Sequence, residues 1–100
     1  MSGAALDSVS AGGRVTVRYW AAARAAAGVA SDDVPLGADG TLAGVLEAVR
    51  ALHPDRPRLG EVVAVCSVLV GDRPVGTAAP DEVRLADGDV VELLPPFAGG

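Results

Sequence analysis

The sequence predicts a single α+β domain in which one helix covers one face of a sheet. A chain of 100 residues is long enough for one hydrophobic core. Several short segments alternate apolar and polar residues, as strands with one buried face do, and one segment has the spacing of an amphipathic helix. Only 3% of the residues are aromatic, so valine, leucine and alanine must fill most of the core.

The domain is expected to span residues 14–94. Residues 1–13 are small and polar without a usable period, which predicts a mobile N-terminal extension. The segment RVTVRYW predicts a half-buried strand that ends at Trp20. Its alternation places Val15, Val17 and Tyr19 on the face toward the core. Arg14, Thr16 and Arg18 lie on the opposite face, toward solvent.

Two shorter elements follow this strand. The segment AAARAAAG has high helix propensity and predicts a short helical turn that stops near Gly28. The segment SDDVPL predicts a second strand, in which Pro35 is compatible only with a sheet edge or a strand start.

The clearest helix begins after Thr41, a favourable N-cap residue. Its solvent side carries Glu47 and Arg50, and the helix is expected to end at His53 because the residue before a proline avoids the α region. The apolar residues form one continuous stripe: Leu42, Val45, Leu46, Val49 and Leu52.

The second half of the chain predicts further strands and turns. Residues 54–61 combine breakers with charged side chains and predict a loop that holds at most one helical turn. The run VVAVCSVLV then predicts a buried strand that enters a tight turn at Gly71 and Asp72. Residues 73–75 would return along it, residues 83–85 would add a brief extended piece, and residues 89–94 would form the last strand.

The composition narrows the range of partners. The formal net charge of -5 would repel phosphate backbones, so nucleic acid is not an expected partner. The first residues lack the pattern of a signal peptide, and no apolar run approaches the ~20 residues of a membrane span. The single cysteine permits a reducing compartment. We therefore expect a cytoplasmic protein without a membrane partner.

Several residues that look reactive have simpler structural explanations. Cys66 lies in an apolar run, where a thiol is usually buried and inert. His53 suits the C-terminal end of a helix, and without clustered ligands it predicts no metal site. Asp32-Asp33 and Asp87-Gly88-Asp89 are typical of turns. No phosphate loop is present, so we expect the chain to bind neither ATP nor another cofactor.

The final segment, LLPPFAGG, has the most specific pattern. Pro95 and Pro96 favour an extended geometry after the last strand, and residues 95–100 form a flexible tail that could reach about 20 Å. Gly99 and Gly100 lack a Cβ, which would let the tail enter a narrow channel. Phe97 is either an anchor for a partner's pocket or a side chain folded back on its own sheet.

Over roughly residues 14–100 the chain resembles the MoaD/ThiS-type ubiquitin-like sulfur carriers, and among them most of all the small subunits of molybdopterin synthase. The segments VRYWAAARAAAG, VLVGDRPV and DGDVVELLPPFAGG carry the resemblance. It implies a β-grasp fold, with a mixed sheet of four to five strands packed on one main helix and an extended C-terminal tail. The double proline favours the molybdopterin carriers over the thiamine carriers.

The resemblance also implies a mechanism in which the chain donates sulfur and a partner catalyses. An E1-like adenylyltransferase would use ATP to adenylate the carboxylate of Gly100, which would then become a thiocarboxylate. The large, catalytic subunit of molybdopterin synthase would accept the tail within a heterotetramer. Because the sequence ends on Gly100, the reactive terminus would be encoded directly. The tail residues that contact partners would be Pro95, Pro96, Phe97, Ala98 and Gly99.

Three alternatives stay open at this point. The chain could be a sulfur carrier for thiamine or cysteine synthesis, a protein modifier, or a β-grasp binding module with an inert tail. The absence of lysine disfavours self-chains linked through lysine but leaves attachment to another protein's lysine open.

Overall fold

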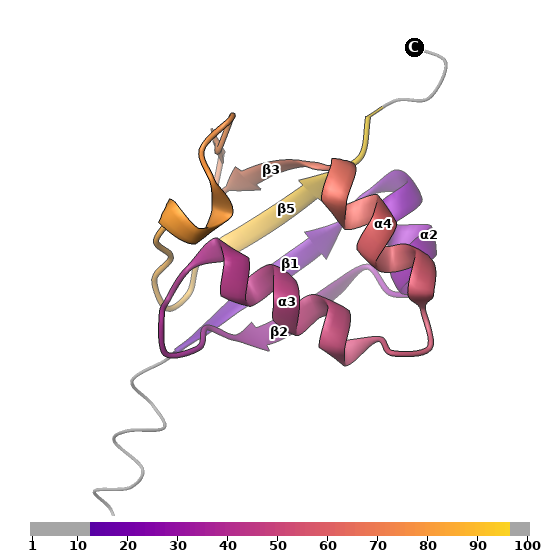
Figure 1. The fold of residues 1–100 in the computed structure, drawn as a ribbon, viewed down its shortest axis with the longest axis horizontal. Helices are drawn as coiled ribbons and strands as arrows, with labels where there is room; N and C mark the ends of the chain where they lie inside the picture. Colours follow the sequence, from indigo (N-terminus) through magenta and orange to yellow (C-terminus); the bar gives the residue numbers. More distant parts are fainter. Residues whose placement is uncertain (1–12, 97–100) are drawn as a thin grey trace, which may run out of the picture.

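The computed structural model describes residues 13–96, in which five strands form one mixed sheet with the helices on one face (Figure 1). The strand order is β2-β1-β5-β3-β4; β1 and β5 are parallel, and the other neighbouring pairs are antiparallel. The predicted β-grasp fold is confirmed. The elements are β1 (Arg14–Tyr19), α2 (Ala21–Ala27), β2 (Ser31–Pro35), α3 (Leu42–Leu52), α4 (Pro57–Val65), β3 (Ser67–Val70), β4 (Arg73–Pro74), the 3-10 helix η1 (Pro80–Glu82) and β5 (Val90–Leu94).

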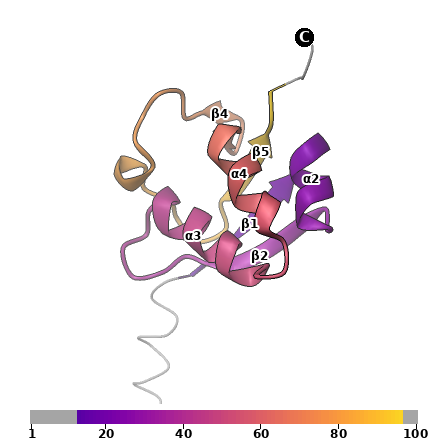
Figure 2. The same cartoon turned by 45° about the vertical axis from the view of Figure 1, so that its right-hand side comes forward.

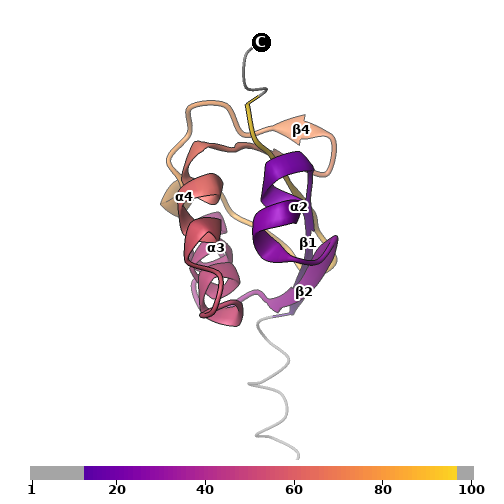
Figure 3. The same ribbon diagram turned by 90° about the vertical axis from the view of Figure 1, so that its right-hand side faces the viewer.

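The core lies between the sheet and the helical layer. Seen edge-on in Figure 3, α3 and α4 lie to one side of the strands. The alternation predicted for β1 is confirmed, because every second residue of the strand is buried against the helices. The largest side chains that are less than 2% exposed come from both layers: Leu42, Val45, Val49 and Leu59 from helices, and Val15, Val17, Val34, Val91 and Leu93 from strands.

The two short elements after β1 are also confirmed. Helix α2 ends at Gly28, which adopts the left-handed conformation with φ of 81° and donates its N–H to the carbonyl of Arg24 at 2.9 Å. Strand β2 lies at the edge of the sheet, beside β1 only, so the missing N–H of Pro35 costs no interior ladder bond.

Helix α3 begins as predicted but buries less of its stripe. The Thr41 hydroxyl accepts a hydrogen bond from the N–H of Gly44 at 3.2 Å, as an N-cap residue does. The expectation that Leu52 joins the buried stripe is wrong, since Leu52 is 48% exposed. It is the last residue of the helix, and the chain turns away at His53 before this side chain is covered.

The loop and the long strand predicted for residues 54–70 are wrong in part. Residues 57–65 form helix α4, which starts with Pro57 in its first turn. Leu59 and Val63, four residues apart, are buried, and the helix packs beside α2 (Figure 2). Only residues 67–70 of the run VVAVCSVLV form a strand. The valine-rich segment has no breaker, so packing against α2 decides that its first half is helical.

The hairpin and the last strand agree with the sequence. Gly71, with φ of 65°, is the first residue of the two-residue turn between β3 and β4. Residues 83–85 contribute one isolated bridge, between Arg84 and Thr41. Strand β5 ends at Leu94, directly before the two prolines.

The predicted N-terminal extension and tail fall largely outside the described residues. Gly13 is described, and its carbonyl accepts the N–H of Leu36 at 3.0 Å. Pro95 is half-buried and Pro96 is exposed. The expectations for residues 1–12 and 97–100 stay predictions. None of the helices in the described part of the chain has the length and apolarity that a membrane crossing requires.

Candidate functional site

The point where the tail leaves the domain is fixed by three strands. Leu94, the last residue of β5, pairs with Ser67 of β3. Leu93 pairs with Tyr19 of β1, and its carbonyl accepts the N–H of Trp20 at 3.2 Å. Pro95 and Pro96 then follow without ladder bonds of their own. The tail therefore starts from a point that is hydrogen-bonded to both neighbouring strands.

A surface patch that we call the tail-root patch lies beside this starting point, on the sheet face away from α3 and α4. The strand register puts its members side by side, since Glu92 is aligned with both Arg18 and Leu69. Trp20 is 40% exposed, an unusual exposure for the only tryptophan of the chain. The patch consists of Arg18, Trp20, Leu69, Glu92 and Leu94.

The patch has an ordered polar structure. The indole N–H of Trp20 donates to Glu92 Oε1 at 2.9 Å, and the guanidinium carbon of Arg18 lies 5.0 Å from the centroid of the indole ring. Leu69 and Leu94 are half-buried. An exposed aromatic ring flanked by leucines and an arginine is typical of a protein-binding surface.

A second cluster, on the helical side of the sheet, was missed by the sequence analysis. Asp32 Oδ2 accepts the Tyr19 hydroxyl at 2.8 Å and contacts His53 Nε2 at 2.6 Å. One Asp32 oxygen therefore joins a side chain of β1 to the residue that follows α3. The explanation of Asp32 and Asp33 by a turn is wrong: both lie in β2, and Asp33 accepts the hydroxyl of Thr16 at 3.0 Å.

This cluster stabilises the fold rather than forming a metal site. Burial, together with the adjacent Asp32 carboxylate, raises the pKa of Tyr19 far above its usual value, so the phenol remains a donor. Within residues 13–96 no three histidine, cysteine or acidic side chains are grouped closely enough to hold a metal ion. Asp32 lies two residues before the buried Val34 and therefore on the same face of β2, and this spacing was the available sequence signal.

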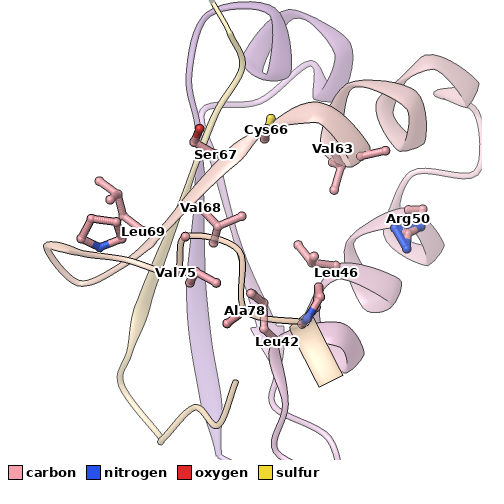
Figure 4. A pocket seen from close by; sticks show the side chains of 14 residues that line it. Leu42, Leu46, Arg50, Val63, Cys66, Ser67, Val68, Leu69, Val75 and Ala78 are labelled. Atoms are coloured by element: carbon pink, nitrogen blue, oxygen red, sulfur yellow. The ribbon is translucent and has the colours of Figure 1, made fainter. Parts of the chain in front are cut away.

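Cys66 lies at the rim of an apolar groove. The groove has a volume of about 460 Å³ and lies between α3, α4, β3 and residues 74–80 (Figure 4). Cys66 is half-buried at the end of α4, not inside a strand. Burial raises the pKa of its thiol to about 11. The thiol is therefore protonated near neutral pH, which agrees with the predicted inert role.

The remaining sequence-predicted residues divide into two groups. Asp87 and Asp89 are turn residues, as predicted: Asp87 Oδ1 accepts the N–H of Arg14 at 2.9 Å, and Asp89 Oδ2 accepts the N–H of Ala86 at 2.8 Å. The predicted tail site, except for its two prolines, lies outside the described residues: Phe97, Ala98, Gly99 and Gly100.

Comparison with known proteins places these features in a family. Residues 17–100 match the ThiS family. The small archaeal modifier protein SAMP1 from Haloferax volcanii has a similar fold, with a TM-score of 0.73 and 25% identity, and the match covers 88% of this chain and 100% of that one. No match was found among curated proteins.

Two further solved structures are similar to this chain. One is a protein assigned as molybdopterin converting factor subunit 1 from Pyrococcus furiosus, with a TM-score of 0.67 and 27% identity over 85% of this chain and 99% of that one. The other is the complex of subunits 1 and 2 of molybdopterin-converting factor from Helicobacter pylori, with a TM-score of 0.55 and 26% identity over 87% and 99% of the two chains.

Proposed function

Because this chain belongs to the ThiS family of ubiquitin-like proteins, we propose that it is a sulfur carrier whose reactive group is the carboxylate of Gly100. The observation that carries the proposal is the tail root: β5 ends at Leu94, and Pro95 and Pro96 then release the chain from the sheet, directly before the segment with the two glycines. Residues 95–100 can reach about 20 Å from the domain when extended, which is far enough to enter a partner's active site.

The chemistry needs an activating partner, because a carboxylate is a poor electrophile. Its oxygen attacks the α-phosphorus of ATP, pyrophosphate leaves, and an acyl adenylate forms. Hydrosulfide then forms a carbon–sulfur bond as the bond to AMP breaks, and AMP departs with the electron pair. The product is a thiocarboxylate at Gly100. No residue of this chain needs to act as a catalyst, and an E1-like adenylyltransferase supplies the ATP site.

The tail-root patch supports partner docking beside the reactive tail. Trp20 and Leu94 expose apolar surface next to the residues where the tail begins. Any enzyme that accepts residues 95–100 in its active site would lie close to this surface, because the tail starts beside it. Burial of the indole ring would supply binding energy without placing bulk on the tail itself.

Within the family, we propose the pathway of molybdopterin synthesis. Two of the similar structures are described as molybdopterin converting factor subunits, and one of them is seen with its subunit 2. The proposed recipient of the sulfur is therefore a large catalytic synthase subunit. The pair of prolines at residues 95 and 96 favours this pathway over the thiamine pathway.

The decisive experiment measures the mass of the chain after charging. The purified protein is incubated with ATP, magnesium, an E1-like adenylyltransferase and hydrosulfide. We expect a product heavier by one exchange of oxygen for sulfur, localised to Gly100 by fragmentation. Gly99→Val should block charging by adding bulk to the tail, whereas Ala51→Val, which introduces the same side chain on the exposed side of α3, should be charged normally.

A second step tests the pathway. The charged protein is mixed with the large synthase subunit and a cyclic pyranopterin monophosphate, and formation of the dithiolene is followed. A charged protein that supports no dithiolene formation would indicate a carrier for thiamine or cysteine synthesis. Attachment of the chain to lysines of other proteins would indicate a modifier. A tail that stays an ordinary carboxylate while a control carrier is charged would contradict the carrier proposal.

A further inference from the structure

The exposed tryptophan at the tail root is held in place by two charged side chains. The Trp20 indole N–H donates to Glu92 Oε1 at 2.9 Å, and the Arg18 guanidinium carbon lies 5.0 Å from the ring centroid. One edge and one face of the indole are therefore occupied by the chain itself, while the residue remains 40% exposed. The orientation of the ring is set before any partner binds.

The backbone fixes the same position. The N–H of Trp20 donates to the carbonyl of Leu93 at 3.2 Å. The next residue, Ala21, has φ of 49° and is the only non-glycine residue with a positive φ in the described part of the chain. This conformation is uncommon for a residue with a Cβ, and such positions gather at functional sites. The local structure thus maintains an unfavourable backbone conformation at the point where Trp20 is presented.

Arg18 lacks an acidic partner within the domain. It is aligned with Glu92 across β1 and β5, yet Glu92 Oε1 accepts from the indole. Among residues 13–96 no arginine side chain is paired with a carboxylate; the one close contact of a carboxylate with a basic side chain there is that of Asp32 with His53. A guanidinium stacked on a ring keeps its edge N–H groups available, and these match a carboxylate in bidentate geometry. Arg18 can therefore donate to an acidic residue of another protein.

We propose that Arg18, Trp20 and Glu92 form a selectivity cluster that recognises the adenylating enzyme through a carboxylate of that enzyme placed against Arg18. The inference rests on the proposed function, which requires an enzyme that accepts the tail. The chain carries a net charge of -5, so most of its surface would repel an acidic residue of a partner. Such a residue would be attracted only near an exposed positive charge such as that of Arg18. Trp20 supplies apolar contact, Arg18 chooses the partner, and Glu92 is a positioning residue.

The test is a kinetic comparison of two charge reversals on the same strand. Formation of the acyl adenylate is followed by pyrophosphate release at increasing concentrations of the carrier. Arg18→Glu should raise KM at least about tenfold and leave kcat unchanged, because it acts on binding and not on the adenylation step. Arg14→Glu, four residues and about 13 Å along the strand, should change KM less than about twofold.

A second pair of variants tests the positioning role of Glu92. Glu92→Ala removes the acceptor for the indole N–H and should raise KM several-fold. Glu92→Gln keeps an acceptor oxygen and should recover most of that loss, although it removes the charge. A role in fold stability alone would instead shift the thermal midpoint without separating KM from kcat.

The outcomes separate this inference from the proposed function. If the wild-type chain is not adenylated at all, the proposed function fails. If the wild-type chain is adenylated and Arg18→Glu has the KM of the wild type, or of Arg14→Glu, only the selectivity cluster is wrong. Recovery of the lost affinity by a reversed charge on the enzyme would establish the contact. Arg18→Glu changing self-association and not KM would assign the cluster to contacts between copies of this chain and would overturn the inference.

Discussion

The two faces of strands β1 and β5 differ in composition and in exposure to solvent. On the helical side, alternate residues of β1 and β5 are almost fully buried: Val15, Val17, Tyr19, Val91 and Leu93. On the other side the same strands carry charged or half-exposed residues, among them Arg18, Glu92 and Leu94. Successive residues of each strand therefore face the core and the opposite side in turn.

Because of this difference, substitutions on one face should affect the stability of the domain, and substitutions on the other face can test the proposed binding of a partner. Residues that face the helices hold β1 and β5 together and thereby fix the root of the tail. Residues on the opposite face are exposed or half-buried, so substitutions there should have little effect on folding and can test the proposed partner contacts. The separation is sharp at the end of β5, where Leu93 is buried and Leu94, one residue later, is half-exposed beside Trp20.

The largest expected difference between the faces is between two neighbouring leucines. Leu93→Ala should lower the free energy of unfolding by about 2–5 kcal/mol, because it opens a cavity in the core. Leu94→Ala should cost about 1 kcal/mol, since its side chain buries less apolar surface. Urea denaturation of both variants measures the difference. Equal losses would show that the outer face belongs to the core.

The two adjacent aspartates of β2 give the next largest effect. Asp32→Ala should cost about 1–3 kcal/mol, because the buried Tyr19 hydroxyl loses its acceptor. Asp33→Ala, on the exposed face, should change stability by less than about 0.5 kcal/mol. Thermal unfolding compares the two. A loss from Asp33→Ala as large as that from Asp32→Ala would remove the structural role of the inner cluster.

Alkaline pH should lower the free energy of unfolding through two partly or fully buried groups, the thiol of Cys66 and the phenol of Tyr19. The thiol of Cys66 has its pKa raised from 9.0 to about 11 on folding, so its contribution to stability is present below about pH 9 and is lost as pH rises toward 11. The raised pKa of Tyr19 acts in the same direction above pH 10. The chain has no lysine to titrate in this range. Unfolding curves from about pH 8 to 11 should show this decline.

Removal of each group identifies its share of the alkaline decline. Cys66→Ala should flatten the part that begins near pH 9, and Tyr19→Phe should flatten the part above pH 10. A decline that is unchanged in both variants would assign it to other groups.

The smallest effect is expected at the end of β1 that is distant from the tail. Arg14→Ala should change the unfolding free energy by less than about 0.5 kcal/mol, because Arg14 is exposed and its backbone hydrogen bonds remain. Equilibrium denaturation checks this. A loss above 1 kcal/mol would mean that the hydrogen bond from the Arg14 guanidinium to the carbonyl of Asp33, 3.1 Å long, contributes more than a surface contact normally does.

Much of the fold follows from local sequence rules. The N-cap at Thr41, the glycines at positions 28 and 71 and the alternation in β1 each depend on neighbours within about four residues, and all are confirmed. Helix α4 was not predicted because its valines fit a strand and a helix equally well. The exposure of Leu52 was missed because periodicity assigns a face but does not show how far the core extends.

Of the candidate site the sequence predicted only the tail, of which the structure tests the strand stop and describes the two prolines, while residues 97–100 stay a prediction. The double proline and the two glycines are adjacent in sequence, and the strand stop at Leu94 is where the sequence puts it. The contact of Trp20 with Glu92 joins residues 72 positions apart, and that of His53 with Asp32 joins residues 21 positions apart. No local pattern encodes such pairs, because the side chains meet only after the sheet has formed.

The sequence by itself determined the alternating faces of the strands and the composition of the tail, since both depend on residue type and spacing along the chain. The tertiary structure alone decided that residues 57–65 are helical, that Tyr19, Asp32 and His53 meet, and that Arg18, Trp20 and Glu92 lie together near the end of β5. The physical reason is range: periodicity and capping act over one or two turns, whereas these contacts exist only once distant segments pack against one another.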